Sequence, residues 1–155
     1  MSTRQLFAKD ALLPTGWAKN IHLTWNDEGV IESVFTDVDA KAINTLSVPH
    51  AKGPLLPGMP NLHSHAFQRG FAGLTEFKNQ SQDSFWSWRT QMYQFALQIS
   101  PAQMLAIAKF LYIEMLQAGY TSVCEFHYLH HDTDGKAYAN AATMAQCLLQ
   151  AAQET

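Results

Sequence analysis

The sequence predicts an α/β fold in which a small β-rich unit comes first and strands alternating with helices follow. Residues 1–52 hold three stretches of β-like composition, QLFAKDALL, WAKNIHLTWN and VIESVFTDV, separated by Pro14, Gly16 and the turn NDEG. The segment AKGPLLPGMPN then contains three prolines and two glycines, and it places a boundary near residue 52. Beyond it the order is strand, helices, strand, helix, which is typical of parallel β/α units. We therefore expect one unit over residues 1–52 and a second over 53–155.

Two helices are expected between the strands of the second unit. In the first, Phe85, Trp88, Met92 and Phe95 recur every three to four residues behind Asp83 or Ser84 as the capping residue. The second begins at Ser100 and Pro101 and ends at Gly119, since serine caps a helix, proline suits its first turn and glycine its end. Its apolar stripe comprises Met104, Ala108, Leu111 and Met115.

A strand and a third helix complete the predicted pattern. TSVCEFHYL (121–129) is a β-branched and aromatic run of strand length, and the loop HHDTDGKAY follows it. Asn140 is the expected cap of the last helix, with Met144, Leu148 and Ala152 on its buried face. Ligands of parallel β/α folds bind at the carboxyl ends of strands, where the histidine-rich segments of this chain fall.

The composition is that of a globular protein without a nucleic-acid or membrane partner. The net charge is −3, with 10 Lys and Arg against 13 Asp and Glu, and neither sign forms a run. No apolar stretch reaches the roughly 18 residues of a membrane span, and no signal peptide is visible, so we expect a cytoplasmic protein with a small-molecule ligand. Cys124 and Cys147 are expected to be buried thiols rather than a disulfide.

His63 and His65 in NLHSH are candidate metal ligands. Residues i and i+2 of a strand project to the same side, so both imidazoles can reach one point while Ser64 faces away. Neutral imidazoles suit zinc. A pair of exposed or hydrogen-bonded histidines at a strand end remains the alternative interpretation.

Three separated motifs carry a family resemblance. LPGMPNLHSHAFQRGFAG resembles the first-strand signature of the amidohydrolase superfamily, and together NLHSHAFQR, FWSWR and EFHYLHHD resemble the formimidoylglutamate deiminases of histidine degradation. The resemblance implies that a zinc-activated water hydrolyses N-formimino-L-glutamate to N-formyl-L-glutamate and ammonia. It also implies a (β/α)8 barrel of the TIM type preceded by a β-rich unit.

The resemblance assigns roles to five residues of this chain. His63 and His65 would be ligands of one Zn²⁺, and Gln68, Arg89 and Tyr128 would contact the substrate. A guanidinium can bind a carboxylate through two parallel hydrogen bonds, and a phenol adds another donor. His127 and Tyr128 would face opposite sides of a strand, and of the two we choose Tyr128. The alternative is that both residues have structural roles only, with Arg89 solvated on its helix and Tyr128 half-buried in its strand.

The remaining polar residues are interpreted as structural. Glu114 and Glu125 show no partner in the sequence, His22 and His50 lie in the β-rich unit, and the HHD of the loop reads as surface. A complete small metal domain would instead need Cys124, His127, His130 or His131 to join His63 and His65.

A whole (β/α)8 barrel takes about 250 residues, whereas residues 53–155 supply about two β/α units. We therefore expect this chain to be the N-terminal portion of an enzyme, with no catalytic residue of its own and little activity in isolation. A full-length protein could form a homodimer. Competing hypotheses are another zinc aminohydrolase of the superfamily and a truncated, non-catalytic polypeptide.

Overall fold

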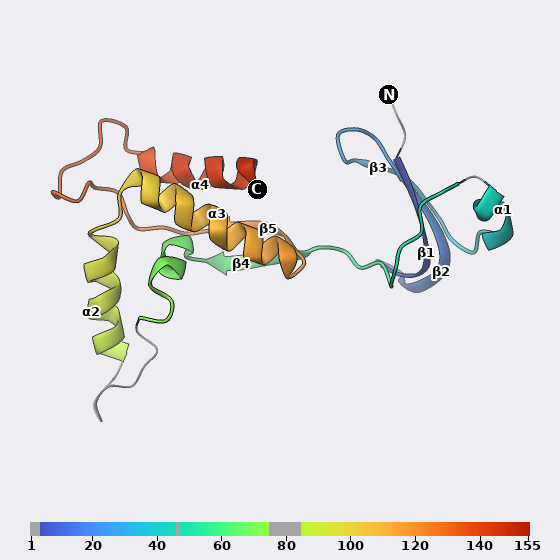
Figure 1. Ribbon diagram of the computed structural model, residues 1–155, viewed down its shortest axis with the longest axis horizontal. Coiled ribbons are helices and arrows are strands. Elements are labelled where there is room, and N and C mark those ends of the chain that lie inside the picture. Colours follow the sequence, from blue (N-terminus) through green and yellow to red (C-terminus); the bar gives the residue numbers. More distant parts are fainter. Residues whose placement is uncertain (1–3, 46, 75–84) are drawn as a thin grey trace. The chain divides into compact units, whose positions relative to one another are not determined.

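The computed structural model describes residues 4–45, 47–74 and 85–155, and these divide into two compact units, residues 1–57 and 58–155. Among these residues no helix is long and apolar enough to span a membrane. The chain traced in Figure 1 runs through the β-rich unit first and then through the α/β unit.

The first unit is β-rich, as the sequence predicted, and forms an antiparallel sheet with strand order β1-β2-β3. Its strands are β1 (Arg4–Leu13), β2 (Gly16–Trp25) and β3 (Ile31–Phe35). A two-residue turn joins β1 to β2, and Gly16 after it has φ 110°, a conformation that glycine adopts without strain. Helix α1 (Ala40–Thr45) follows, and its buried Ile43 packs with Phe7 and Val48.

The segment rich in proline and glycine runs alongside β1 before it leaves the sheet. Isolated bridges pair Phe7 with His50 and Ala11 with Leu55, and the Leu55 amide donates to the Asp10 carbonyl at 2.9 Å. These contacts hold residues 50–55 to β1, and the compact units divide between Pro57 and Gly58.

The second unit contains a parallel strand pair, β4 (Met59–Ser64) and β5 (Tyr120–Glu125), with its helices between and after the strands. Helices α3 (Pro101–Gln117) and α4 (Thr143–Glu154) lie side by side, as Figure 1 shows. Gly58 leads into β4 where a Cβ atom would collide with the side chain of Thr121, so only glycine fits there. Strand β5 is shorter than the predicted 121–129, and residues 126–129 continue as irregular chain.

Helix α3 begins as the sequence predicted. The Ser100 hydroxyl accepts the Gln103 amide and the Gln103 side chain accepts the Ser100 amide, with Pro101 in the first turn. Gly119 follows the helix with φ 91°. The fully buried positions are Met104, Ala108 and Tyr112, one turn apart, whereas the predicted Leu111 and Met115 are half-buried beside them.

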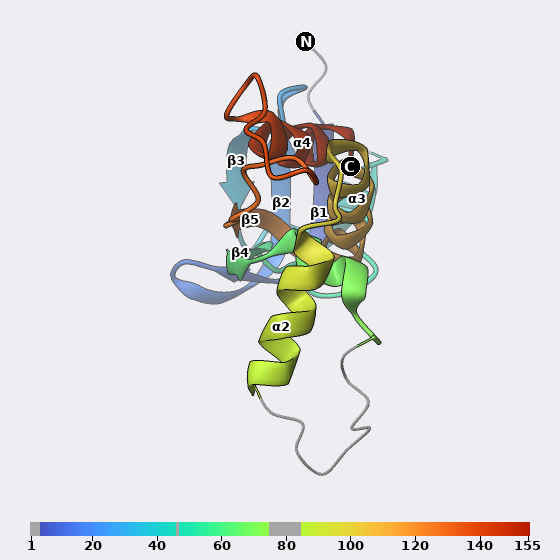
Figure 2. The same cartoon turned by 90° about the vertical axis from the view of Figure 1, so that its left-hand side faces the viewer.

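The other two helices differ from prediction in detail. Helix α2 (Phe85–Ala96) buries Met92 and Ala96 but leaves Phe85 62% exposed. Its expected caps, at positions 83 and 84, lie outside the described residues. Figure 2 shows that α2 extends away from the strand pair. Its fully buried side chains, Met92 and Ala96, lie in its second half, and the partly buried Trp88 packs against the core from its first turn.

The turn before α4 uses Asn140 differently from the expected helix cap. The Asn140 side chain accepts the Ala142 amide in a turn before the helix, which begins only at Thr143. Ala151 is buried in place of the predicted Ala152, because the buried face follows Met144 and Leu148 at a spacing of four and then three.

The core of the second unit draws on every helix around the strand pair. Its buried side chains are Ala66, Phe67, Phe71, Met92, Ala96, Ile99, Met104, Ala108, Tyr112, Leu129, Met144, Leu148 and Ala151. Both cysteines are free, as expected, but neither is fully buried as predicted: Cys124 is exposed and Cys147 is half-buried. Ala66, Phe67 and Phe71 belong to this core and follow His65 in the chain, so the core anchors the histidine motif.

Candidate metal and substrate site

His63 and His65 meet at the end of β4. The strand ends at Ser64, which is buried, and His65 joins it to a short 3₁₀ helix, η1 (Ala66–Phe71). The two Nε2 atoms are 3.1 Å apart, and the rings are nearly perpendicular, with centroids 4.8 Å apart. The i, i+2 spacing thus brings both imidazoles to one point.

This arrangement fits a zinc ion. Two imidazole nitrogens that bind zinc tetrahedrally at about 2.0–2.1 Å lie about 3.3 Å from each other. The observed separation of 3.1 Å between the Nε2 atoms is within a few tenths of an ångström of that value. The positions of the two nitrogen atoms therefore fit the metal with little movement of the rings.

The neighbouring strand fixes the ring of His65. Its Nδ1 lies 2.8 Å from the carbonyl oxygen of Phe126. Because a carbonyl can only accept a hydrogen bond, Nδ1 carries the proton and Nε2 of the neutral ring presents its lone pair. Ligating histidines are commonly oriented by such a bond from the second ring nitrogen. His63 Nε2 then donates to His65 Nε2 in the metal-free chain.

An open hollow of about 250 Å³ surrounds the pair, lined by Leu62, His63, Ser64, His65, Cys124, Glu125 and Phe126. Within the described ranges no three His, Cys, Asp or Glu side chains come together closely enough to hold a metal ion. Among these residues, Cys124, His127, His130 and His131 thus do not join the pair.

The histidines of the following loop form a separate contact. The rings of His127 and His130 are 5.1 Å apart, and the Nδ1 of His127 lies 3.2 Å from the Leu129 carbonyl. Burial lowers the pKa of His127 below its ordinary value, and the nearby charge of His130 acts in the same direction. His127 is therefore disposed to remain neutral.

Gln68 and Tyr128 contact each other beside the histidine pair. The Gln68 amide donates to the Tyr128 hydroxyl at 3.2 Å, and both reach the Met92 sulfur, at 3.4 and 3.3 Å. The Tyr128 ring lies 5.7 Å from that of His65. Strand alternation cannot explain this orientation, because β5 ends at Glu125; packing of the Tyr128 ring against Phe67, at 5.1 Å, accounts for it.

Arg89 lies further out, on the exposed side of α2. Its guanidinium carbon is 5.0 Å from the centre of the Tyr93 ring and 5.8 Å from that of Trp86. The Tyr93 ring is 6.4 Å from Tyr128. Arg89 is thus linked to the other predicted residues through Tyr93 and does not touch them directly.

Both glutamates interpreted as structural have partners. Glu114 binds Arg69 of η1 through two hydrogen bonds, at 2.7 and 2.9 Å, and this contact holds the pKa of its carboxyl below the ordinary value. Glu125 accepts the Ala66 amide at 2.7 Å and the Tyr112 hydroxyl at 3.3 Å. Burial, and then the charge of Glu125, raise the pKa of Tyr112 above its usual range.

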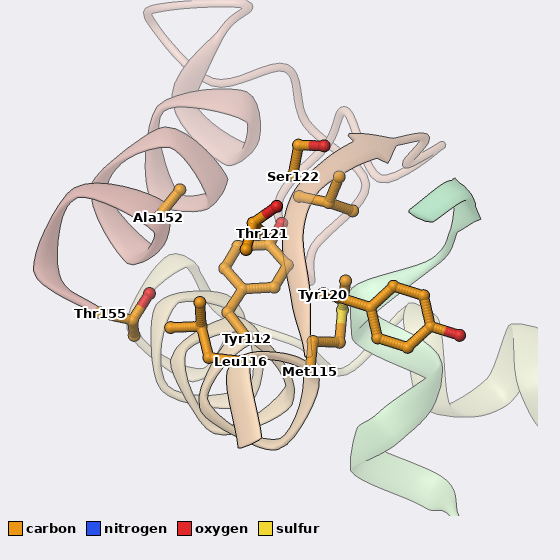
Figure 3. A pocket seen from close by; sticks show the side chains of 9 residues that line it. Tyr112, Met115, Leu116, Tyr120, Thr121, Ser122, Ala152 and Thr155 are labelled. Atoms are coloured by element: carbon orange, nitrogen blue, oxygen red, sulfur yellow. The ribbon is translucent and has the colours of Figure 1, made fainter. Parts of the chain in front are cut away.

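A larger hollow of about 370 Å³ lies between α3, β5 and the end of α4. Figure 3 shows Tyr112, Leu116 and Thr121 on its walls, with Ala152 and Thr155 from α4 opposite. None of its lining residues belongs to the histidine pair or to the predicted substrate contacts. The smaller hollow at the histidines is therefore the candidate functional site.

Comparison with solved structures shows which fold the chain shares. The chain is similar to an amidohydrolase from Brucella melitensis, with 48% identity and a TM-score of 0.86 over 97% of this chain and 32% of that one. An atrazine chlorohydrolase mutant from Arthrobacter aurescens, solved with zinc and atraton, shares the fold at 14% identity and a TM-score of 0.62, over 96% of this chain and 33% of that one. The chain therefore shares its fold with part of the amidohydrolase structure.

Sequence relatives narrow the resemblance further. Residues 3–47 match the family described as the N-terminal domain of formimidoylglutamate deiminase HutF. The chain is 49% identical to the formimidoylglutamate deiminase of Pseudomonas aeruginosa over 95% of its own length and 31% of that protein. The predicted relationship to the formimidoylglutamate deiminases is confirmed, and the chain spans about a third of the length of the relatives it matches.

Proposed function

We propose that this chain provides the first part of the metal and substrate site of a zinc-dependent formimidoylglutamate deiminase. In this proposal β4 and β5 are the first two strands of a (β/α)8 barrel, following a β-rich unit over residues 1–52 extended by the segment along β1. The reaction adds water to the formimino carbon of N-formimino-L-glutamate and releases ammonia, leaving N-formyl-L-glutamate.

One observation carries the metal part of the proposal. His63 and His65 present two Nε2 atoms 3.1 Å apart, and His65 is held in the tautomer whose Nε2 carries a lone pair that can bind a metal. A bound zinc ion supplies a water whose pKa is lowered to about 7 and which can attack near neutral pH. The substrate class follows from the relative that is 49% identical.

The polar side chains next to the pair fit the substrate. The glutamate moiety carries two carboxylates, and the Arg89 guanidinium can bind one of them through two parallel hydrogen bonds. Gln68 and Tyr128 already form one hydrogen bond to each other at 3.2 Å, so a substrate could exchange that contact for its own. The Tyr128 hydroxyl can donate to a carboxylate or to the formimino nitrogen.

Two histidines are fewer than the three protein ligands of most catalytic zinc sites. Since no third ligand joins them within the described residues, we expect the 155-residue chain to bind zinc weakly and to turn over little substrate alone. The further ligands and the residue that activates the water would come from parts of a longer deiminase beyond the length matched here. The oligomeric state stays a prediction, and so does a cytoplasmic location, which free thiols at both cysteines would suit.

The test starts from the protein purified from its own cells. We would measure its intact mass, its zinc content, and ammonia release from formiminoglutamate and from purine, pyrimidine and guanidino compounds. His63→Ala and His65→Ala should each lower the zinc content, whereas His22→Ala, in the β-rich unit, should not. Unchanged zinc in both site variants would contradict the metal assignment, and preference for another substrate would favour a different aminohydrolase.

A further inference from the structure

We infer that Glu125 is a positioning residue for His65, holding the turn that presents this imidazole to the metal. The inference rests on the proposed function for the metal, but it follows from contacts in the metal-free chain. Glu125 touches neither imidazole through a hydrogen bond that the structure shows; it binds the backbone next to His65.

The backbone changes direction at His65. β4 ends at Ser64, and η1 begins at Ala66, with His65 between them at φ −132° and ψ 76°. The Ala66 amide is one of the first donors of η1, so it has no acceptor within that helix. A carboxylate oxygen of Glu125 accepts it at 2.7 Å. The partner comes from 59 residues along the chain, at the end of the adjacent strand.

Glu125 and Phe126, at the end of β5, bind the three residues of the turn, 64–66. The Phe126 amide donates to the Ser64 carbonyl at 2.9 Å, and the Phe126 carbonyl accepts from the His65 ring at 2.8 Å. Glu125 adds the contact to Ala66. Without it, the start of η1 could shift relative to Phe126, and the bond that sets the His65 tautomer would lengthen.

Glu125 is itself held in place. Its second carboxylate oxygen accepts the hydroxyl of Tyr112, at 3.3 Å, and Tyr112 is only 5% exposed in the core on α3. The carboxylate therefore connects a rigid helix to the metal-binding turn. A hydrogen bond to an ionised acceptor is stronger than one between neutral groups, which suits a residue that must fix geometry.

The first experiment reads the tautomer of His65 by ¹⁵N NMR of the metal-free 155-residue chain above the pKa of histidine. The wild type should show the Nδ1–H form. Glu125→Ala should admit the Nε2–H form, whereas Glu125→Gln should keep the wild-type spectrum, because its amide oxygen can still accept from Ala66. Glu125→Asp, whose carboxylate is one methylene too short, should behave like the alanine variant and serves if that variant does not fold.

The second experiment measures the zinc affinity of the same variants by titration. Glu125→Ala and Glu125→Asp should weaken binding by about 10- to 100-fold, the range typical of residues that orient metal ligands, and Glu125→Gln by no more than a few-fold. Glu114→Ala is the matched control, because it also removes a carboxylate that binds η1, at Arg69, without touching the turn. It should leave both the tautomer and the zinc affinity unchanged.

Two results would overturn the inference. One is an unaltered His65 tautomer in both Glu125→Ala and Glu125→Asp; the other is an equal change in Glu114→Ala, which would mean that loosening η1 anywhere suffices. The tautomer measurements decide the role of Glu125 without zinc, and the zinc content of the protein from its own cells decides the proposed function separately.

Discussion

Replacing Phe67 by alanine should destabilise the second unit while leaving the β-rich unit unchanged. Phe67 is 0% exposed, two residues after His65, and its ring packs against Tyr128 at 5.1 Å and Phe71 at 6.5 Å. Burying a phenylalanine side chain contributes about 1.5–3 kcal/mol, and the cavity left behind raises the cost of its removal to about 3–5 kcal/mol. The site should loosen with the core, because Tyr128 loses its packing partner.

Amide hydrogen exchange measures this loss for each unit separately. In Phe67→Ala, the most protected amides of α3 should exchange about a hundredfold to a few thousandfold faster. This factor is the loss of about 3–5 kcal/mol in unfolding free energy, converted into a ratio of exchange rates. Amides of β1 and β2 serve as the internal standard. Phe85→Ala is the matched control, since Phe85 is 62% exposed and its loss should cost about 0.5 kcal/mol or less. Less than about a fivefold change in α3, or an equal change in β1, would refute the reasoning.

Three further predictions follow from single side chains. In the active enzyme, Arg89→Met should raise KM for formiminoglutamate by tenfold or more with a smaller effect on kcat, because a hydrogen bond to a charged group contributes about 1.5–3 kcal/mol; an unchanged kcat/KM would contradict its assignment. The pKa of Tyr112 is raised in the folded chain, so its neutral form stabilises the fold fully below about pH 10, and this contribution is lost as the pH rises further. Tyr112→Phe should therefore flatten the decline in the free energy of unfolding between about pH 9 and 11, as measured by denaturation. Exposed Cys124 should react with iodoacetamide faster than half-buried Cys147, whose thiol pKa is raised by burial, and mass spectrometry of labelled peptides would reveal the opposite order if this is wrong.

Local sequence signals determined the order of elements and the position of the histidine pair. Ser100, Pro101 and Gly119 delimit α3 because caps and glycine ends act within one turn of a helix. The i, i+2 spacing of His63 and His65 set both rings on one side because strand geometry repeats every two residues. Neither inference required knowledge of a distant residue.

Only the tertiary structure decided which side chains support the pair. Glu125 reaches Ala66 across 59 residues, and the amide of Gln68 reaches Tyr128 across 60, contacts that no local pattern encodes. The end of β5 at Glu125, opposite the end of β4 at Ser64, was likewise not visible in the composition of residues 121–129. The sequence by itself therefore determined the order of strands and helices and the spacing of the histidine pair, while packing between distant segments determined which side chains hold the pair in place.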